Sequence, residues 1–398
     1  MTTTSPMSVH DRVAAVLRGE KPDRLPFIDR IDVWYACHKR NGTLPAEFAG
    51  RPPAEIHRAI GMGQQKFVVP YLLKLHGVEV IARFNGQICY HETDPCLEFF
   101  CGMFDYLDTT KAGVTQTELI TPVGKLRVQH ELLEDNVATG TEHYIREHFI
   151  KEDEDYKTVE YLIEHAEFVP RFDRVSEQES LLGDIGYVVP MAPRLPFQQV
   201  LLEYLGEVSL FYALNDSAAQ VERLMTVLDD QLAEILARLK DLPVAYVEFP
   251  DNLHGLMTNP RLFARYSLPG YQRHCETLHR QGKKAGSHTD GDVKPLLSLL
   301  AESGLDVCES FSPYPLTPCT FDEAWQAWRG KPLIWGGIPS PILEERTSQA
   351  DFEDYVRILL NTVGDGPIIL GVGDLVMGHN SIERVRAIAR QVEAHPIR

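Results

Sequence analysis

The second half of the chain alternates short β-rich apolar runs with amphipathic segments, and this rhythm constrains the fold more than any other feature. An antiparallel sandwich does not alternate in this way, so we predict a parallel sheet with crossover helices. The helical segments, of which Asp216–Lys240 is the longest, carry apolar residues near helical spacing. The β-rich runs are Gly186–Pro190, Ala245–Phe249, Lys284–His288, Val307–Ser310, Leu333–Gly337 and Ile368–Val372.

The N-terminal half supplies two more candidate strands, Arg24–Ile31 and Gln65–Pro70. Eight strands would close a barrel, whereas six would leave an open doubly wound sheet. No G-x-G-x-x-G motif follows a strand and opens a helix, which removes the main reason to prefer a dinucleotide-binding fold. We therefore predict an α/β fold of the (β/α)8 TIM-barrel type, formed by residues 1–398 as a single domain.

Residues 80–165 interrupt this rhythm. Three segments there have the composition of strands: Val78–Arg83, Gly86–His91 and Thr115–Ile120. A turn at 121–124 then leads into Lys125–Gln129, which predicts a hairpin. We predict a β-rich excursion over one end of the barrel, followed by a helix that starts in the acidic run 152–155.

Composition narrows the classes of partner. The chain has 39 Lys and Arg against 57 Asp and Glu, a formal charge of -18, and no local basic cluster, which argues against nucleic-acid binding. No apolar stretch approaches the length that crosses a bilayer, and the Thr/Ser-rich start at 1–6 reads as a frayed tail without a signal sequence. Seven cysteines without a C-x-x-C pair fit a reducing compartment. We expect a soluble cytoplasmic protein, with a homodimer left open.

In parallel barrels the functional groups collect at the carboxyl ends of the strands. His288 and Asp290 form an H-x-D pair at such an end, and side chains two residues apart on an extended strand leave the same face. Imidazole and carboxylate together suit a divalent ion such as zinc. The alternative is that His288 ends the strand and Asp290 caps the next helix, although Asp292 is better placed for that cap.

Glu248 and Glu309 are acids inside otherwise apolar strands. A buried carboxylate must neutralise or find a partner, so each could be a metal ligand, a general acid or base, or an acid held by backbone N–H groups. Cys308 should point to the opposite face from Glu309, and we expect Glu309 to face the barrel interior. We take Glu248, His288, Asp290 and Glu309 as the candidate catalytic residues.

Four further residues are candidates for substrate binding. Asp374 ends the last strand after glycines that allow a close approach, and Asn252 follows the strand of Glu248. Arg30 and Tyr35 lie beside the first strand, where Arg30 could bind a carboxylate or pair with Asp29 or Asp32.

The sequence is similar to the uroporphyrinogen decarboxylase superfamily in three segments, whose order and spacing carry the resemblance. These segments are 11–27 (with LRGEKPDRLPF at its end), 331–341 (KPLIWGGIPSP) and 366–384 (GPIILGVGDLVMGHNSIER). The resemblance implies a single (β/α)8 barrel.

True uroporphyrinogen decarboxylases carry an arginine-rich R-Q-A-G-R segment after the first strand, and residues 30–40 lack it. The other branch of the superfamily contains corrinoid-dependent methyltransferases. Its thiol-methylating members hold zinc with an H-x-C pair and a later Cys, and His288-x-Asp290 and Asp374 look like those positions here. Carboxylate in place of thiolate gives a harder site, better matched to an oxygen ligand. The Asp–Gly after His288 and the segment 309–313 look more like the methyl-ether-demethylating group.

The resemblance therefore implies a methyltransferase that moves a methyl group from a small O- or N-methyl compound, such as a methoxy-aromatic, to a corrinoid (cobalamin) on a partner protein. A divalent metal, expected to be Zn²⁺, would be held by His288, Asp290, Glu309 and Asp374. The alternative on the same barrel is a decarboxylase of the uroporphyrinogen type, which needs no metal. A carrier protein for a corrinoid or tetrapyrrole would not need several acids at strand ends.

Overall fold

The computed structural model describes residues 6–397, so the Thr/Ser-rich start lies largely outside the described residues. Eight parallel strands form two sheets, ordered β1-β2-β13 and β14-β15-β16-β17-β18. Single parallel bridges join the two sheets at both edges, between Phe27 and Leu370 and between Met191 and Glu248. The strands are β1 (Ile28–Asp29), β2 (Gly63–Val68), β13 (Gly186–Pro190), β14 (Tyr246–Phe249), β15 (Lys284–His288), β16 (Val307–Phe311), β17 (Leu333–Pro339) and β18 (Ile368–Gly373).

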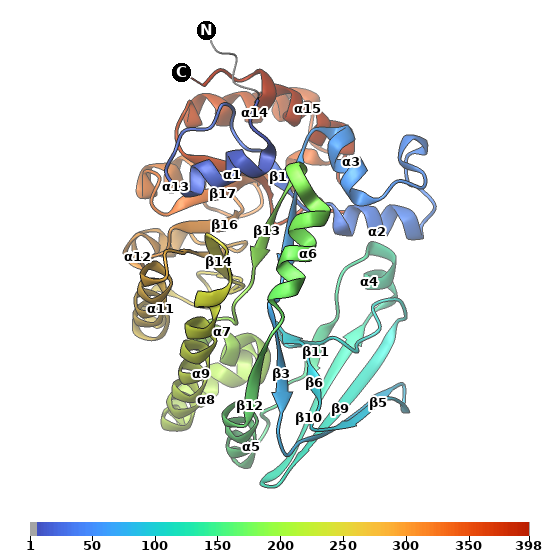
Figure 1. The fold of residues 1–398 in the computed structure, drawn as a ribbon, viewed down its shortest axis with the longest axis vertical. Coiled ribbons are helices and arrows are strands. Elements are labelled where there is room, and N and C mark those ends of the chain that lie inside the picture. The colour runs from blue at the N-terminus through green and yellow to red at the C-terminus, as the bar shows by residue number, and fades with distance from the viewer. Residues whose placement is uncertain (1–5, 398) are drawn as a thin grey trace.

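Helices cover the outer faces of these strands (Figure 1). The long helix α9 shows why: its buried residues Val221, Leu224, Leu228 and Leu232 recur at helical spacing, so one face packs inward and the other meets water. The helices are α1 (Val9–Leu17), α2 (Asp32–Arg40), α3 (Pro53–Ile60), α6 (Phe172–Leu182), α7 (Pro196–Gln199), α8 (Glu207–Asp216), α9 (Ala218–Arg238), α10 (Pro260–Leu262), α11 (Leu268–Arg280), α12 (Leu297–Glu302), α13 (Phe321–Trp328), α14 (Gln349–Val363) and α15 (Ile382–Ala394). None of the helices within residues 6–397 is long and apolar enough to cross a membrane.

The first strand is shorter than predicted, because Arg24–Ile31 contributes only the two residues of β1. Pro26 has no N–H to give to a ladder, and the carboxylate of the buried Asp29 accepts the N–H of Val372 in place of a backbone carbonyl. The segment still reaches the neighbouring strand, since the N–H of Leu370 donates to the carbonyl of Pro26 at 2.9 Å. A side chain thus replaces part of a backbone ladder beside the last strand.

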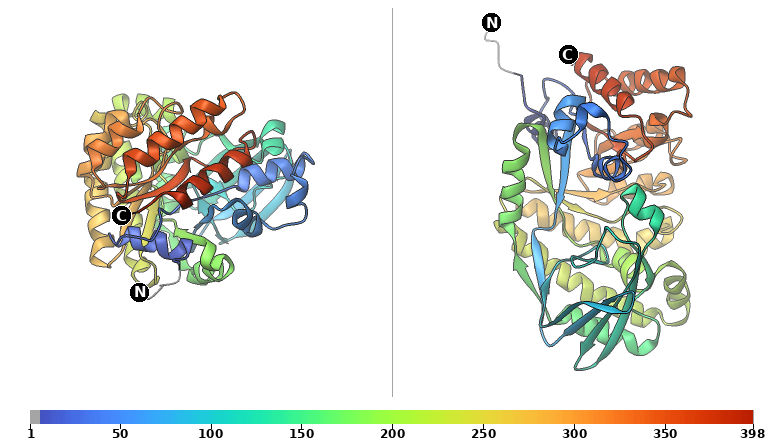
Figure 2. Two further views of the ribbon diagram at one scale, coloured as in Figure 1. Left: turned by 90° about the horizontal axis from the view of Figure 1, so that it is seen from above. Right: turned by 90° about the vertical axis from the view of Figure 1, so that its right-hand side faces the viewer.

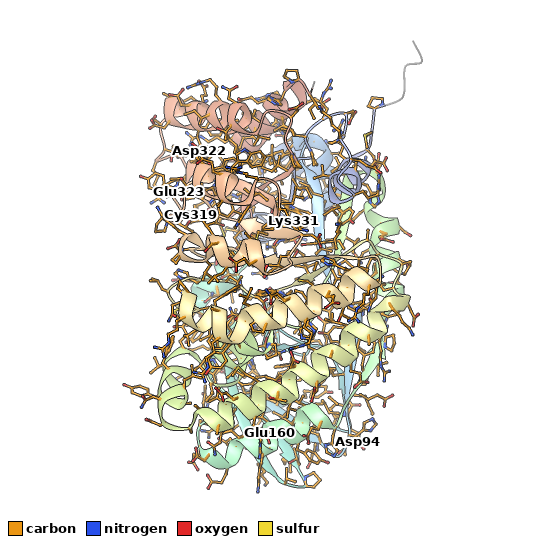
Figure 3. All side chains as sticks on the ribbon, turned by 90° about the vertical axis from the view of Figure 1, so that its left-hand side faces the viewer. Asp94, Glu160, Cys319, Asp322, Glu323 and Lys331 are labelled. Atoms are coloured by element: carbon orange, nitrogen blue, oxygen red, sulfur yellow. The ribbon has the colours of Figure 1, made fainter. Side chains whose placement is uncertain are left out.

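Residues 71–170, between β2 and β13, are mainly antiparallel and lie towards the end of the molecule opposite to α14 and α15 (Figures 1 and 2). Asp94 and Glu160 mark this end in Figure 3, whereas Asp322 and Glu323 mark α13 towards the other end. One sheet has the order β11-β10-β9-β4-β5 and another β12-β3-β6. The elements are β3 (Tyr71–Leu75), β4 (Glu79–Phe84), β5 (Gln87–Thr93), β6 (Cys96–Leu97), β7 (Phe99–Phe100), β8 (Met103–Phe104), β9 (Gly113–Thr121), β10 (Gly124–Leu132), α4 (Glu134–Thr139), β11 (Tyr144–Glu147), α5 (Asp153–Glu164) and β12 (Ala166–Pro170).

The predicted hairpin is present: β9 pairs with β10 from Thr121 opposite Gly124 outwards, and the hydroxyl of Thr121 closes the turn by donating to the carbonyl of Gly124. The acidic run begins a helix as expected, with Glu152 as the N-cap of α5. A second apolar core lies between this β-rich part, α5 and the amino-terminal half of α9; Val80, Leu126, Val159 and Leu228 belong to it. The β-rich part is therefore packed against the helices that surround the parallel strands.

A candidate histidine and carboxylate site

The predicted catalytic residues meet at the carboxyl ends of β14, β15 and β16. His288 is the last residue of β15, and its neighbours in the sheet place Glu248 on β14 and Glu309 on β16 beside it. The Nδ1 atom of His288 lies 2.6 Å from Oε2 of Glu309 and 3.8 Å from Oε1 of Glu248. All three side chains are buried. Glu309 faces the interior as predicted. The buried Cys308 lies near Cys275 of the outer helix α11.

The other side of the imidazole faces two more acids. Its Nε2 atom lies 3.4 Å from Oδ1 of Asp374, which follows β18, and 3.9 Å from Oδ2 of Asp290. The four acids are therefore divided between the two ring nitrogens, Glu248 and Glu309 on one side and Asp290 and Asp374 on the other. One ion cannot bond both nitrogens of one imidazole. Of the four predicted ligands, Glu309 therefore lies on the opposite side of the ring from Asp290 and Asp374.

Local irregularities of the backbone set the directions of the Glu309 and Asn252 side chains. The register of β16 against β17 shifts between Cys308 and Phe311, and Ser310 has a φ of 58°. Such a bulge turns a side chain away from the regular pleat, and non-glycine residues in the left-handed region cluster at functional sites. The Ser310 hydroxyl donates to the carbonyl of Asp374 at 3.2 Å, and so ties the bulge to the end of β18. Asn252, with a φ of 48°, occupies the same strained region beyond β14.

The two buried glutamates on the Nδ1 side of His288, Glu248 and Glu309, have pKa values shifted in opposite directions. Burial, followed by the charge of Glu309, raises the pKa of Glu248 well above its usual value. Burial also acts against ionisation of Glu309, but His288 outweighs it and holds the pKa of Glu309 below its usual value. Of the two acids, Glu248 therefore holds its proton more readily than Glu309. The hydroxyl of Tyr246 donates to Oε2 of Glu248 at 2.8 Å, and the amide of Gln65 donates to Glu309 at 2.8 Å.

His288 has carboxylates on both sides of its ring, Glu309 at Nδ1 and the two aspartates at Nε2. Burial disfavours its imidazolium form, but Glu309, Asp290 and Asp374 together raise the pKa of His288 well above its usual value. Burial likewise opposes ionisation of Asp374, and the contact with His288 keeps the pKa of Asp374 low. Without another cation, the ring therefore carries the positive charge that these carboxylates require.

The predicted substrate-binding residues divide into two groups. Arg30 pairs with Asp374 at 3.3 Å rather than with the side chain of Asp29 or Asp32, and its guanidinium stacks over the ring of Phe67 at 4.3 Å. The amide of Asn252 donates to Oδ2 of Asp290 at 3.0 Å. Tyr35 lies on α2, where its hydroxyl donates to the carbonyl of Arg51. The structure does not bring Tyr35 to these groups.

Several residues that complete the site escaped the sequence reasoning. Gln65 stood inside a predicted strand, where a buried amide is a signal for an interior partner. Tyr246 lies two residues before Glu248, and so shares its face of β14. Arg194 follows β13 and donates to Oδ1 of Asn252 at 2.7 Å and to Oε1 of Glu203 at 2.9 Å. Sequence spacing gave no sign that Arg194 and Asn252 are neighbours, because they are 58 residues apart. They meet only because β13 and β14 lie side by side, joined by a single bridge.

The chain thus presents a parallel α/β scaffold with histidine and acids gathered at the carboxyl ends of its strands. Residues 208–395 match the family described as "Uroporphyrinogen decarboxylase (URO-D)". This part of the chain contains β14 to β18 and the histidine and carboxylate cluster. The match confirms the resemblance to this superfamily that the sequence motifs predicted.

One solved structure is similar in fold over nearly the whole chain. A structure described as "methyltransferase from Methanosarcina mazei" is similar over 98% of this chain and 99% of that chain, with 12% sequence identity and a TM-score of 0.57. At this identity the likeness concerns the fold. A GH5 cellulase from a Bacteroidetes-affiliated source matches 57% of this chain and 79% of its own, with 14% identity and a TM-score of 0.34, too low to carry an argument. No curated protein matches the sequence significantly.

Proposed function

We propose that this protein is a methyltransferase that moves a methyl group from a small O- or N-methyl compound, such as a methoxy-aromatic, to the cobalt of a corrinoid held by a partner protein. The observation that carries the proposal is the division of four acids between the two nitrogens of His288. One pair fixes the ring, and the other pair can share a divalent ion, for which zinc is the best match, with Nε2. The Methanosarcina mazei structure, a methyltransferase by its description, supports the proposal through its fold.

The donor set fits such an ion. Ligands of a tetrahedral zinc with bonds of ~2.1 Å lie about 3.4 Å from one another. The distances from Nε2 of His288 to Asp374 and Asp290 are 3.4 and 3.9 Å, so small side-chain adjustments suffice. A site with three protein ligands leaves a fourth position for substrate. Our ligand set is therefore His288, Asp290 and Asp374.

Glu309 takes a different part, because it is on the far side of the ring. A carboxylate that accepts the Nδ1–H of a ligating histidine fixes the tautomer that leaves Nε2 free to bind. Glu248, which is fully buried, lies on the same side and accepts from the hydroxyl of Tyr246. We assign Glu248 to holding Glu309 and His288 in place, since its buried position does not face an entering substrate.

Methyl transfer breaks the bond between the methyl carbon and its heteroatom, which keeps the electron pair, while the reduced corrinoid supplies the pair for the new bond to carbon. The ion would act as a Lewis acid that stabilises charge on the departing oxygen or nitrogen. The chain contributes orientation: Asn252 holds Asp290, and Arg30 holds Asp374. Arg30 also offsets part of the negative charge of the acids at the mouth.

We also infer that the eight parallel strands act as one closed (β/α)8 barrel within a single domain, with the β-rich part over one end. The single bridges at both sheet edges support this inference. The large corrinoid would approach the carboxyl ends of the strands. Exposed apolar side chains on loops beyond β14 and β16, Leu256 at 73% and Tyr314 at 63% exposed, offer a surface for the partner protein there.

The alternative is a decarboxylase of the uroporphyrinogen type, which the family match favours. Such an enzyme must bind a substrate with many carboxylates through cationic groups. The two arginines at the site are already neutralised, Arg30 by Asp374 and Arg194 by Glu203. We therefore rank methyl transfer first.

An assay with free cob(I)alamin as acceptor tests the proposal. The zinc-loaded full chain is incubated with guaiacol (2-methoxyphenol), and methylcobalamin formation is followed by its absorbance. We expect turnover that His288→Ala abolishes and that Glu276→Gln, on the exposed face of α11, leaves intact. A parallel assay measures release of coproporphyrinogen from uroporphyrinogen. Sustained decarboxylation without methyl transfer from any O- or N-methyl compound would reverse the ranking.

A further inference from the structure

Asn252 has a backbone conformation that its surroundings must hold in place. Its φ of 48° lies in the left-handed region, where residues other than glycine are uncommon and persist when neighbouring groups fix them. In this conformation the amide of Asn252 donates to Asp290 at 3.0 Å, and its oxygen accepts from Arg194 at 2.7 Å. The groups that fix the backbone of Asn252 therefore also fix the direction of the Asp290 carboxylate.

The carboxylate of Asp251 is the first of these groups. Asp251 is fully buried two residues beyond β14, and its Oδ1 atom accepts the N–H of Leu195 at 2.8 Å. Its Oδ2 atom accepts from the hydroxyl of Tyr271 on α11 and, at 3.4 Å, from the hydroxyl of Ser287 on β15. Burial raises the pKa of Asp251 to about 6, so at pH 7 the group is mainly the carboxylate that accepts from these three donors.

Gln198 holds the same turn through the main chain. Its amide donates to the carbonyl of Asp251 at 2.6 Å, and this carbonyl belongs to the peptide bond that leads into Asn252. The side-chain oxygen of Gln198 accepts from the hydroxyl of Thr258 at 2.6 Å, which sets the orientation of the amide. Both Gln198 and Thr258 are buried, so water does not compete for these bonds.

The other side of Asn252 is tied to the strand of the histidine. The N–H of Leu253 donates to the carbonyl of His288 at 3.2 Å. The turn 251–253 is therefore held on both sides of Asn252, and one of the two ties reaches the main chain of a proposed ion ligand.

We propose that Asp251 and Gln198 are positioning residues of the candidate ion site, which hold the turn 251–253 so that the amide of Asn252 orients the carboxylate of Asp290 towards the ion. The inference rests on the proposed function, because it takes Asp290 as a ligand. The hydrogen bonds of the two side chains go to groups other than the side chains of the three proposed ligands, so both residues act through Asn252.

The competing account is that Asp251 only joins α11 to β15. Asp306 offers a matched control, because it makes the same kind of connection at the other end of β15. Its carboxylate accepts the N–H of Ala285 at 3.0 Å and lies 2.6 Å from the ring of His279 on α11. Asp306→Ala should therefore lower stability without changing ion binding.

Cobalt(II) titration of the full chain, followed by visible absorption, measures the effect on the site. We expect Asp251→Ala and Gln198→Met each to weaken cobalt binding ~10-fold, the lower end of the effect of an outer partner, which corresponds to about 1.4 kcal/mol. Gln198→Met removes the amide at similar volume, and carries the test if Asp251→Ala does not fold. Thermal unfolding of the metal-free proteins shows which variants are folded. Asp306→Ala should bind cobalt like the unchanged protein.

Combination with Asn252→Ala tests the route. Asn252→Ala alone should weaken cobalt binding by a similar factor, because Asp290 loses its donor. If Asp251 and Gln198 act through Asn252, neither of their substitutions should weaken binding further in the Asn252→Ala protein. Independent structural effects would instead add.

Unchanged cobalt affinity in a folded Asp251→Ala or Gln198→Met protein, or an equal loss in Asp306→Ala, would overturn the inference. Additive losses in the combined variants would overturn it as well. Absence of cobalt binding in the unchanged protein would overturn the inference together with the ion of the proposed function. If cobalt binding depends on Asp251 and Gln198 as expected but no methyl transfer follows, the inference stands and the proposed function fails.

Discussion

Replacing Glu309 by glutamine should weaken zinc binding even though Glu309 is not a ligand in our account. The carboxylate lies 2.6 Å from Nδ1 of His288 and accepts from Gln65 at 2.8 Å. Glutamine has nearly the same volume and can still accept from Nδ1–H, but without the negative charge that makes Nε2 a stronger base. Loss of such an outer partner typically lowers metal affinity ~10- to 100-fold, or about 1.4 to 2.7 kcal/mol.

Competition with a chromophoric chelator measures this affinity in the purified full chain. Glu276→Gln, an exposed acid on α11 away from the cluster, makes the same chemical change and should leave zinc affinity unaltered. Thermal unfolding of the metal-free proteins shows whether Glu309→Gln is folded. Zinc affinity equal to that of the unchanged protein in a folded Glu309→Gln variant would refute the assignment of Glu309 to orienting His288.

Two further predictions concern stability. A Cβ atom at Gly286 would lie 1.8 Å from the hydroxyl oxygen of Tyr246, so Gly286→Ala must displace that ring and break its hydrogen bond to Glu248. Chemical denaturation should show that this variant loses about 3 kcal/mol of unfolding free energy. Tyr246→Phe, which removes only the hydroxyl, should lose about 1 kcal/mol. Burial lowers the pKa of both His57 and His130 to about 4, so the unfolded chain binds more protons below pH 6.5. Each of these two histidines should therefore lower the unfolding free energy by about 2 kcal/mol between pH 7 and pH 5. His130→Gln keeps a donor to the carbonyl of Gly102, and its unfolding free energy, measured by denaturation, should depend less on pH. An unchanged pH dependence in that variant, or a Gly286→Ala protein as stable as the unchanged one, would contradict these packing arguments.

The sequence predicted the parallel strands well because their apolar runs and flanking helices are local patterns. His288, Glu248 and Glu309 could be proposed as neighbours since parallel strands bring their carboxyl ends to one edge. The division of the acids between the two ring nitrogens could not be read in this way. It depends on the bulge at Ser310 and on the orientation of one imidazole, which are set by packing across several strands.

The positions of Tyr35 and Arg194 could not be predicted from the sequence either, for opposite reasons. Tyr35 is close in sequence to Arg30, but α2 directs its hydroxyl to Arg51. Arg194 is far from Asn252 in the sequence, yet the two meet where β13 and β14 join. Contacts between segments distant in the chain are fixed by the tertiary fold, for which residue spacing holds no signal.

The position of a single divalent ion at Nε2 of His288 is the central claim, and cobalt substitution measures it most directly. Cobalt(II) reports its coordination through visible absorption, so a titration gives both stoichiometry and geometry. We predict one cobalt per chain in the unchanged protein, retained in Glu248→Gln and lost when Asp290→Asn and Asp374→Asn are combined. Stoichiometric cobalt that survives the combined change but disappears in Glu248→Gln would place the ion on the opposite side of the ring and contradict the account.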